Sequence, residues 1–210
     1  FRKIGLPYTV GYGMTEAAPL LAYSHAKDYV PGSCGKRVDS AEVRIDSEDP
    51  EHIAGEIQAR GSNITIGYFN NPEASANAFT EDGYLHTGDL GTMDKEGNIT
   101  IRGRSKNMIL SANGQNIYPE EVEAVINAQD YVAESVVVSR NSKLVGLVYF
   151  AADGILKAGL DAEAVHDLPE HIRHKANRIL PSYSQLVSIE TVSEPFEKTP
   201  KMSIKRFLYK

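Results

Sequence analysis

Residues 11–16, with the sequence GYGMTE, place an aromatic ring between two glycines and follow it with a hydroxyl and a carboxylate. Glycine lets a backbone approach a ligand closely, and the Tyr12 ring can stack on a nucleotide base. The oxygens of Thr15 and Glu16 are hard ligands that suit Mg²⁺ bridging two phosphates. Without further context, a glycine turn leading into a helix capped by Thr15 explains the segment equally well.

Two residues farther along the chain have side chains that suit a ribose or a phosphate. Asp89 ends a predicted strand among small and apolar residues, and a carboxylate has enough lone pairs to accept from both hydroxyls of a ribose. The competing interpretation is an aspartate that caps its own turn. Arg104 follows the flexible Gly103 and carries a planar fork that can bind phosphate or ribose oxygens.

Positive charge collects at the end of the chain. Within the last 15 positions a single acid, Glu197, faces five basic residues, which are Lys198, Lys201, Lys205, Arg206 and Lys210. A solvated tail and a mobile cationic arm that approaches phosphates both explain this pattern. The chain as a whole is acidic, with 22 Lys+Arg against 28 Asp+Glu, which argues against a nucleic acid as the owner of such phosphates.

The composition is that of an ordinary globular protein, with 210 residues of which 41% are hydrophobic and 24% charged. The longest uncharged apolar run, 144–152, is far shorter than the roughly 20 residues that cross a bilayer, so we expect no membrane span and leave peripheral membrane contact open. The lone Cys34 has no activating neighbour, which favours inert packing in a reducing cytoplasm. The chain begins at Phe1, and from this start we expect no signal peptide and a piece of a longer protein.

These candidate residues need elements to position them, and the pattern divides the chain in two. Residues 1–102 predict short strands in a small barrel or curled sheet, with a helix that starts at Pro72, has Asn71 as its N-cap and runs to Phe79. The predicted strands are 41–46, 55–60, 86–93 and 98–102. Residues 107–210 predict a smaller α+β domain, and 103–106 predict a hinge between the two.

Within residues 107–210, Pro119 is expected to begin a helix that follows a glycine loop at Gly114. Strands 134–140 and 144–152 are joined by a two-residue hairpin turn at 141–142, a further helix is expected from Pro169, and strand 185–192 precedes the basic tail. Three histidines form a small cluster, His166, His171 and His174, the last two of them on the later helix; we expect a solvated helix face rather than a metal site.

Taken in this order, the segments resemble the adenylate-forming superfamily of acyl-CoA synthetases, nonribosomal peptide adenylation domains and luciferases, and within it the long-chain fatty-acid–CoA ligase type. Segments 55–57, 61–68 and 71–74 match as well. The resemblance implies a mixed fold: a distorted β-barrel-like subdomain that ends a large AMP-binding domain, then a mobile α+β domain. It also implies an enzyme that uses ATP and Mg²⁺ to convert a carboxylic acid to its acyl adenylate and passes the acyl group to the thiol of coenzyme A.

The resemblance implies a role for each matching position. Tyr12, with Gly13 beside it, would stack on adenine, Thr15 would touch the phosphate and Glu16 would hold Mg²⁺. Asp89 and Arg104 would bind the ribose, Ile101 would pack on the nucleotide, Lys106 would be the hinge, and Gly114 would line the path of the pantetheine thiol.

Two departures from the family's pattern change these expectations. The Ser/Thr/Gly-rich phosphate loop that precedes the Tyr12 segment in the family is absent, so we expect no adenylation by this chain alone. The family's C-terminal signature is Thr-Pro, two residues and a lysine, but here Ser203 stands at the lysine position, and a hydroxyl cannot supply its charge. Either Lys201 or Lys205 reaches in by a local shift, or adenylation is impaired while thioester formation survives.

Residues 17–22, AAPLLA, lie beside the acyl tunnel in relatives and are small and apolar, which suggests a fatty acid rather than an amino acid. Medium-chain and aromatic acids stay open. The rival interpretations are a ligase that loads a carrier protein or stops at the acyl adenylate, and a homologue that binds a nucleotide or a partner without catalysis.

Overall fold

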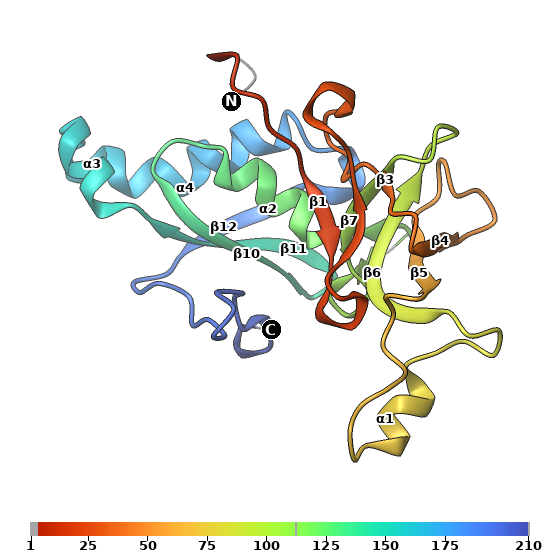
Figure 1. The fold of residues 1–210 in the computed structure, drawn as a ribbon. Coiled ribbons are helices and arrows are strands. Elements are labelled where there is room, and N and C mark those ends of the chain that lie inside the picture. The colour runs from red at the N-terminus through yellow and green to blue at the C-terminus, as the bar shows by residue number, and fades with distance from the viewer. Residues whose placement is uncertain (1–3, 112, 210) are drawn as a thin grey trace. The chain divides into compact units, whose positions relative to one another are not determined.

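Four antiparallel strands form the main sheet of the first part of the chain, in the order β4-β5-β6-β7 (Figure 1). The computed structural model describes residues 4–111 and 113–209, which form two compact units divided between Lys106 and Asn107. A second sheet has the order β1-β2-β3. The bounds are β1 Gly11–Gly13, β2 Leu20–Tyr23, β3 Lys36–Arg37, β4 Ala41–Asp46, β5 Gly55–Gly61, β6 Leu85–Met93 and β7 Ile99–Arg104.

Each of the four strands predicted in this unit is present, but the predicted barrel-like closure is not confirmed. Both sheets are open, and their strand orders run from one edge to the other. The link between them is short: Lys36 forms an isolated bridge with Asn98, and backbone bonds join Cys34 and Gly35 to Ile99. These few contacts connect the two sheets at one place and do not close them into a barrel. Side chains from both sheets share one core. That core contains Leu21, Ala22, Ile57, Ala59 and Ile99, each fully buried.

Helix α1, Pro72–Asn77, begins where the sequence predicts. The side chain of Asn71 accepts a hydrogen bond from the Ala74 N–H at 3.0 Å, and Pro72 occupies the first turn, where its missing N–H costs nothing. The helix ends before the predicted Phe79 because Phe79 forms a β-bridge with Leu85. Two short 3-10 turns, Thr15–Ala17 and Ala26–Asp28, complete the first unit together with the loops.

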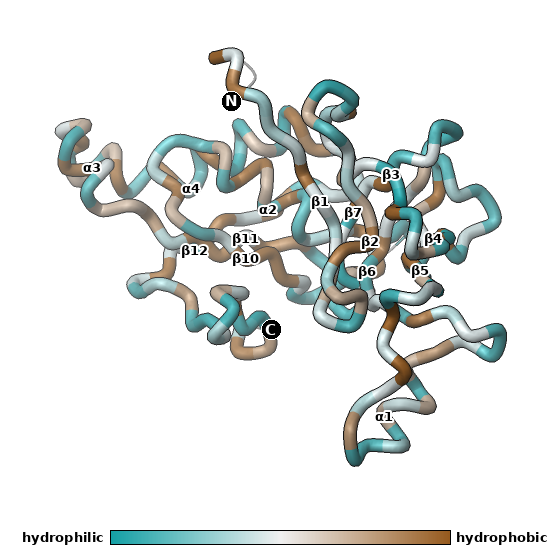
Figure 2. The backbone as a smooth tube through the Cα atoms, in the orientation of Figure 1, coloured by the Kyte–Doolittle hydropathy of each residue, from teal (hydrophilic) through white to brown (hydrophobic). Residues whose placement is uncertain are grey.

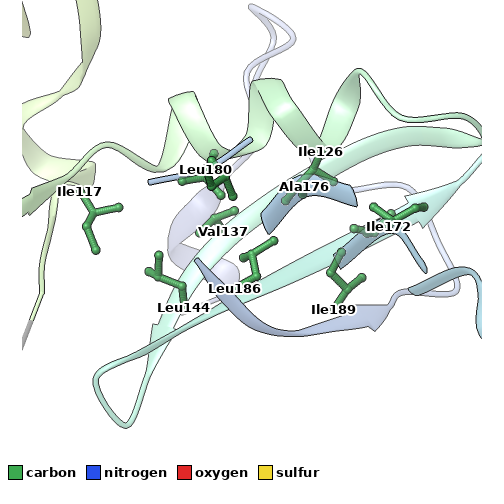
Figure 3. Close-up of a cluster of buried hydrophobic side chains, with 11 residues drawn as sticks. Ile117, Ile126, Val137, Leu144, Ile172, Ala176, Leu180, Leu186 and Ile189 are labelled. Atoms are coloured by element: carbon green, nitrogen blue, oxygen red, sulfur yellow. The ribbon is translucent and has the colours of Figure 1, made fainter. Parts of the chain in front are cut away.

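The second unit is built on a sheet in the order β10-β11-β12, with β10 Val132–Arg140, β11 Lys143–Phe150 and β12 Leu186–Thr191. Helices α2 (Pro119–Asn127) and α4 (Ala162–Asn177) pack on one face of it, where Ile126, Ile172 and Ala176 are almost completely buried (Figures 1 and 3). Figure 2 shows hydrophobic stretches where β10 and β11 run side by side. A small ribbon, β8 (Ile109–Leu110) with β9 (Asn116–Ile117), precedes α2.

The opposite face of this sheet is covered by the end of the chain. Strand side chains alternate between the faces, so Val136 and Val138 point away from the helices while Val137 points toward them. Phe196 is buried on the outer face and packs edge-on against Tyr209, with ring centroids 4.9 Å apart. The basic tail is therefore packed against the sheet over part of its length.

One helix prediction in this unit is wrong. Helix α4 begins after Asp161, whose carboxylate accepts from the Ala164 N–H at 2.8 Å, and Pro169 lies inside the helix rather than at its start. Strand β11 also stops at Phe150, since helix α3, Ala152–Ala158, follows at once. The hairpin turn is confirmed: Asn141 and Ser142 both have positive φ, as a primed turn requires. Within residues 4–111 and 113–209, no helix is both long enough and apolar enough to cross a membrane.

Candidate active site

Three of the predicted site residues lie together in the first unit. The Tyr12 hydroxyl donates to Oδ2 of Asp89 at 2.8 Å, and Nε of Arg104 lies 2.9 Å from Oδ1 of the same carboxylate. Asp89 on β6 and Arg104 on β7 are direct cross-strand partners, so the register of this strand pair sets their contact. Tyr12 comes from β1, which belongs to the other sheet. The structure thus joins residues 77 positions apart into one polar cluster.

The cluster is buried at one end and open at the other. Tyr12 and Asp89 are each 6% exposed, whereas the side chain of Arg104 is half exposed. Burial, together with the neighbouring charge of Asp89, raises the pKa of the Tyr12 hydroxyl above its ordinary value, so the phenol keeps its proton and donates it. The two bonds fix the orientation of the Asp89 carboxylate before any ligand arrives.

The turn that carries Asp89 is held by residues for which the sequence predicted no role. Gly88 has φ +69°, and its N–H donates to Oε1 of Glu56 at 3.0 Å. The other oxygen of Glu56 lies 2.6 Å from Nδ1 of His86. Thr87 donates to the Ile57 carbonyl at 2.6 Å and accepts from the Asp89 N–H. These contacts between β5 and β6 surround an irregularity in the strand register and fix the orientation of Asp89. Contacts between strands leave no local signal in the sequence.

The predicted phosphate and metal residues occupy the 3-10 turn after β1. A Cβ at Gly13 would stand 2.0 Å from the Pro19 carbonyl oxygen, so this close approach of two backbones requires glycine. Thr15 is exposed and caps no helix; Met14 is the N-cap residue and makes no side-chain cap bond, so the capping interpretation is wrong. Glu16 is half-buried, and its Oε1 accepts from the Tyr68 hydroxyl at 3.1 Å.

Two further predicted residues lie on or just after β7. Ile101 is 36% exposed, and an apolar side chain open to solvent on this strand could cover a ligand. Lys106 is exposed in the 3-10 turn Ser105–Asn107, where the two units divide. The hinge at 103–106 stays a prediction.

Gly114 lies in the second unit, in the connection between β8 and β9. Its φ is +80°, and a Cβ there would meet nothing within 4 Å, so the backbone conformation rather than lack of room favours glycine. Backbone bonds from Gly114 to Ser111 and from Ser111 to Gln115 hold the loop.

Residues 199–203, which resemble the family's C-terminal signature, form a tight hairpin. The Met202 N–H bonds to the Thr199 carbonyl at 2.8 Å, the Thr199 N–H bonds to the Ser203 carbonyl at 2.8 Å, and Met202 has φ +62°. This is a three-residue loop with Pro200 at its first position. Lys201 stands in the loop, and Ser203 begins the returning arm.

The two candidate lysines have different surroundings. Lys205 forms an ion pair with Glu197, and its backbone N–H bonds to the Glu197 carbonyl. Lys201 is exposed and has no ion-pair partner in the described part of the chain. Of the two, Lys201 is therefore the one whose ammonium can move to a ligand without breaking an existing pair.

Glu123 on α2 is a buried acid to which the sequence analysis assigned no role. It is 7% exposed, accepts from the Val137 N–H at 2.6 Å, and pairs with Arg206. Val137 lies on β10, an edge strand, so the carboxylate satisfies an N–H that the ladder leaves unpaired. Burial raises the pKa of Glu123 to about 7, although Arg206 favours the charged form.

This raised pKa gives stability a pH dependence. Between pH 4.5, the ordinary value, and about pH 7 the folded state holds a proton that the unfolded state releases, so this carboxyl lowers the free energy of unfolding as pH rises. Glu123→Gln cannot ionise. We therefore expect the free energy of unfolding of this variant, minus that of the parent, to rise by about 2 to 3 kcal/mol from pH 5 to pH 8. Urea unfolding, followed by hydrogen exchange in peptides from β10 and β11, measures it.

The exposed Glu163→Gln on α4 is the control for removal of one carboxylate. A difference between Glu123→Gln and the parent that is equal at both pH values would show that Arg206 offsets the cost of burial and would contradict the prediction.

Cys34 is packed in the core, and His174 takes part in a surface ion pair. The thiol of Cys34 is buried, and burial raises its pKa, which disfavours the reactive thiolate. His174 pairs with Glu170 at 2.9 Å on an exposed face of α4. Among the residues that the structure describes, no group of three or more His, Cys, Asp or Glu side chains is arranged to hold a metal ion.

Comparison with known protein families gives two matches that together span most of the chain. The family described as "AMP-binding enzyme" matches residues 1–69, and the one described as "AMP-binding enzyme C-terminal domain" matches residues 106–209.

Curated relatives are CoA ligases for chemically different acids. The long-chain-fatty-acid–CoA ligase FadD15 of Mycobacterium tuberculosis is 32% identical over 98% of this chain and 36% of its own length. The 2-succinylbenzoate–CoA ligase of Bacillus cytotoxicus is 35% identical over 80% of this chain and 36% of its own length. The 4-coumarate–CoA ligase 5 of Oryza sativa subsp. japonica is 42% identical over 61% of this chain and 25% of its own length. The chain spans about a third of the length of such relatives.

Solved structures that are similar to this chain also include CoA ligases. The o-succinylbenzoate CoA synthetase of Bacillus subtilis, in complex with its acyl-adenylate intermediate, superimposes with a TM-score of 0.85 and 26% identity over all of this chain and 42% of its own. The anthranilate CoA ligase AuaEII, in complex with anthranoyl-AMP, has a TM-score of 0.81 and 25% identity over 98% of this chain and 38% of its own.

Proposed function

Because the chain belongs to the AMP-binding enzymes, we propose that it takes part in an ATP-dependent acid–thiol ligase. The carboxylate of the acid attacks the α-phosphorus of ATP, the acyl adenylate forms and pyrophosphate leaves. The thiol of coenzyme A then attacks the acyl carbon, and AMP leaves with the electrons of the broken bond. The observation that supports this proposal is the cluster of Tyr12, Asp89 and Arg104, in which two bonds hold the Asp89 carboxylate next to the exposed end of Arg104.

The nucleotide is bound by groups that the fold already holds in place. Asp89 accepts hydrogen bonds from the ribose hydroxyls, and Arg104 donates to ribose oxygens from its exposed end. Tyr12 presents its ring to the base while its hydroxyl holds Asp89, and Ile101 contacts the nucleotide from β7. Groups fixed before binding lower the entropy lost on binding, and they position the α-phosphorus for attack.

The metal site is proposed on Glu16. A half-buried carboxylate next to the Thr15 hydroxyl offers the hard oxygen ligands that Mg²⁺ prefers, and Tyr68 orients one of its oxygens by donating to it. When bound with ATP, Mg²⁺ neutralises charge on the phosphates. Thr15, which is exposed at the start of the same turn, contacts a phosphate oxygen through its hydroxyl.

The positive charge that adenylation requires is assigned to Lys201. The attacking carboxylate and the α-phosphate are both anionic, so a cation must lie between them. Ser203 cannot provide it, and Lys205 already pairs with Glu197. The residues at the 103–106 hinge would let the second unit change position between the two half-reactions, and the open loop at Gly114 would admit the pantetheine thiol.

The proposed acid is a fatty acid. Of the six apolar residues 17–22, only three have side chains that are not buried in the core. Ala17, Leu21 and Ala22 are fully buried in the core, so packing alone explains them. Ala18 and Pro19 are exposed and Leu20 is half-buried, which leaves these three apolar side chains to contact an acyl chain. The buried, unreactive Cys34 is consistent with the proposed reducing cytoplasm.

The test measures the two half-reactions separately in the complete gene product. Pyrophosphate release and thioester formation are followed for medium- and long-chain fatty acids, 4-coumarate and 2-succinylbenzoate, with coenzyme A or a pantetheinylated carrier protein as acceptor. We expect fatty acids to be used best and coenzyme A to be the better thiol. Nucleotide binding without pyrophosphate release from any acid would overturn the proposal in favour of a non-catalytic homologue.

A further inference from the structure

The two arms of the 199–203 hairpin are tied to different elements of the second unit. On the first arm, Lys198 forms an ion pair with Glu134 on β10, and the Phe196 N–H bonds to the same carboxylate at 3.3 Å. On the second arm, Arg206 pairs with Glu123 on α2. The loop that holds Lys201 lies between these two attachments, which leave it exposed to solvent.

Arg206 lies between two acids of one helix face. Its Nη2 contacts Glu123 and lies 3.8 Å from Oε1 of Glu120, and only 19% of its side chain is exposed. Glu120 also accepts from the Asn107 side chain at 2.7 Å, and its buried Oε2 has no hydrogen-bond partner in residues 4–111 and 113–209. The guanidinium therefore lies between the carboxyl groups of two acids on α2.

The ion pair between Arg206 and Glu123 is not needed to hold the end of the chain on the sheet. Apolar contacts of Phe196 and Tyr209 already hold the end of the chain on the outer face of the sheet. Buried ion pairs contribute little net stability compared with apolar side chains of similar volume, but their direction fixes geometry. Glu123 also accepts a hydrogen bond from the Val137 N–H on β10. The contact with Glu123 therefore connects Arg206 to both helix α2 and strand β10.

We infer that Arg206 is a positioning residue, which by pairing with Glu123 and Glu120 fixes the returning arm of the hairpin and thereby the place from which Lys201 acts in acyl-adenylate formation. The inference rests on the function proposed above. Thioester formation needs no cation from this loop, so loss of Arg206 slows the first half-reaction and spares the second.

The first arm of the test needs no catalysis. Hydrogen exchange of the chain is compared among the parent, Arg206→Ala, Arg206→Lys and the control Arg140→Ala, which removes a surface pair with Glu190 in the same unit. We expect Arg206→Ala to speed exchange at Met202, Ser203 and Lys205 by about tenfold and to leave peptides from β10 and β11 unchanged. Arg140→Ala should leave the hairpin amides as they are in the parent.

The second arm measures the half-reactions in the complete gene product. Arg206→Ala should slow pyrophosphate release by about 100-fold, as misplacement of a catalytic group does, while the conversion of supplied acyl adenylate to thioester stays within about twofold of the parent. Arg206→Lys should restore most of the rate, because it keeps the charge.

Unchanged exchange at the hairpin, or equal slowing of both half-reactions, would overturn the inference. A parent that releases no pyrophosphate would instead contradict the proposed function, and the exchange experiment would then decide by itself whether Arg206 holds the hairpin.

Discussion

Replacing Lys201 with alanine is expected to slow acyl-adenylate formation by about 1,000-fold, since loss of one preorganised charge at a transition state typically costs 100- to 1,000-fold and no other cation in the loop replaces it. The hairpin makes the expectation specific to this lysine. Lys201 is exposed in the loop, whereas Lys205 lies at the base and pairs with Glu197. Single-turnover pyrophosphate release by the complete gene product measures the effect, and its thioester formation from supplied acyl adenylate should be unchanged.

Three further variants make the result interpretable. Lys205→Ala should have a smaller effect than Lys201→Ala, because it removes a pair at the base of the hairpin. Lys157→Ala on the exposed helix α3 controls for loss of one positive charge. Ser203→Lys in the Lys201→Ala background should restore part of the rate, since it returns an ammonium to the same hairpin, next to the loop.

The opposite pattern would be equally informative. If the parent releases no pyrophosphate until Ser203→Lys is introduced, Lys201 does not replace the missing lysine, and the activity would be limited to the thioester half-reaction.

Local signals in the sequence predicted much of the fold. Asn71 before Pro72 marks the start of α1, and the residues at 141–142 mark the β10–β11 turn, because a cap or a turn depends on a few adjacent residues. Pro169 led to a wrong start for α4, because a proline is usually found in the first turn of a helix and here lies inside one. Leu168, Ile172 and Ala176 are buried, and the packing of Ile172 and Ala176 in the core beneath α4 keeps the helix continuous through Pro169.

The candidate site divides in the same way. Tyr12, Asp89 and Arg104 could be found because their types and order match a family, and the structure brings them together. Glu56 could not, because it acts by a bond to the Gly88 N–H 32 residues away. The pairing of Arg206 with Glu123, 83 residues apart, is likewise set by the packing of the tail and leaves no pattern in the sequence.

The second large effect is expected at Asp89. Asp89→Asn keeps the size of the side chain, but the neutral amide leaves Arg104 without the charge of its ion-pair partner and replaces one accepting oxygen with an NH₂ donor. Hydrogen bonds to a charged group are worth about 1.5 to 3 kcal/mol, so we expect AMP to bind about 100-fold more weakly to the complete gene product. Titration calorimetry measures the dissociation constant.

A comparison with AMP lacking the 2′ and 3′ hydroxyls shows whether the lost affinity belongs to the ribose. If Asp89 binds the diol, removing the carboxylate and removing the hydroxyls cost the same interaction, so the two losses should be far from additive. Tyr12→Phe, which keeps the ring but removes the hydroxyl that donates to Asp89, should weaken AMP binding by about tenfold, and Asp28→Asn on an exposed turn controls for net charge. Fully additive losses would mean that Asp89 supports the fold of the site through Tyr12 and Arg104 and does not touch the ribose.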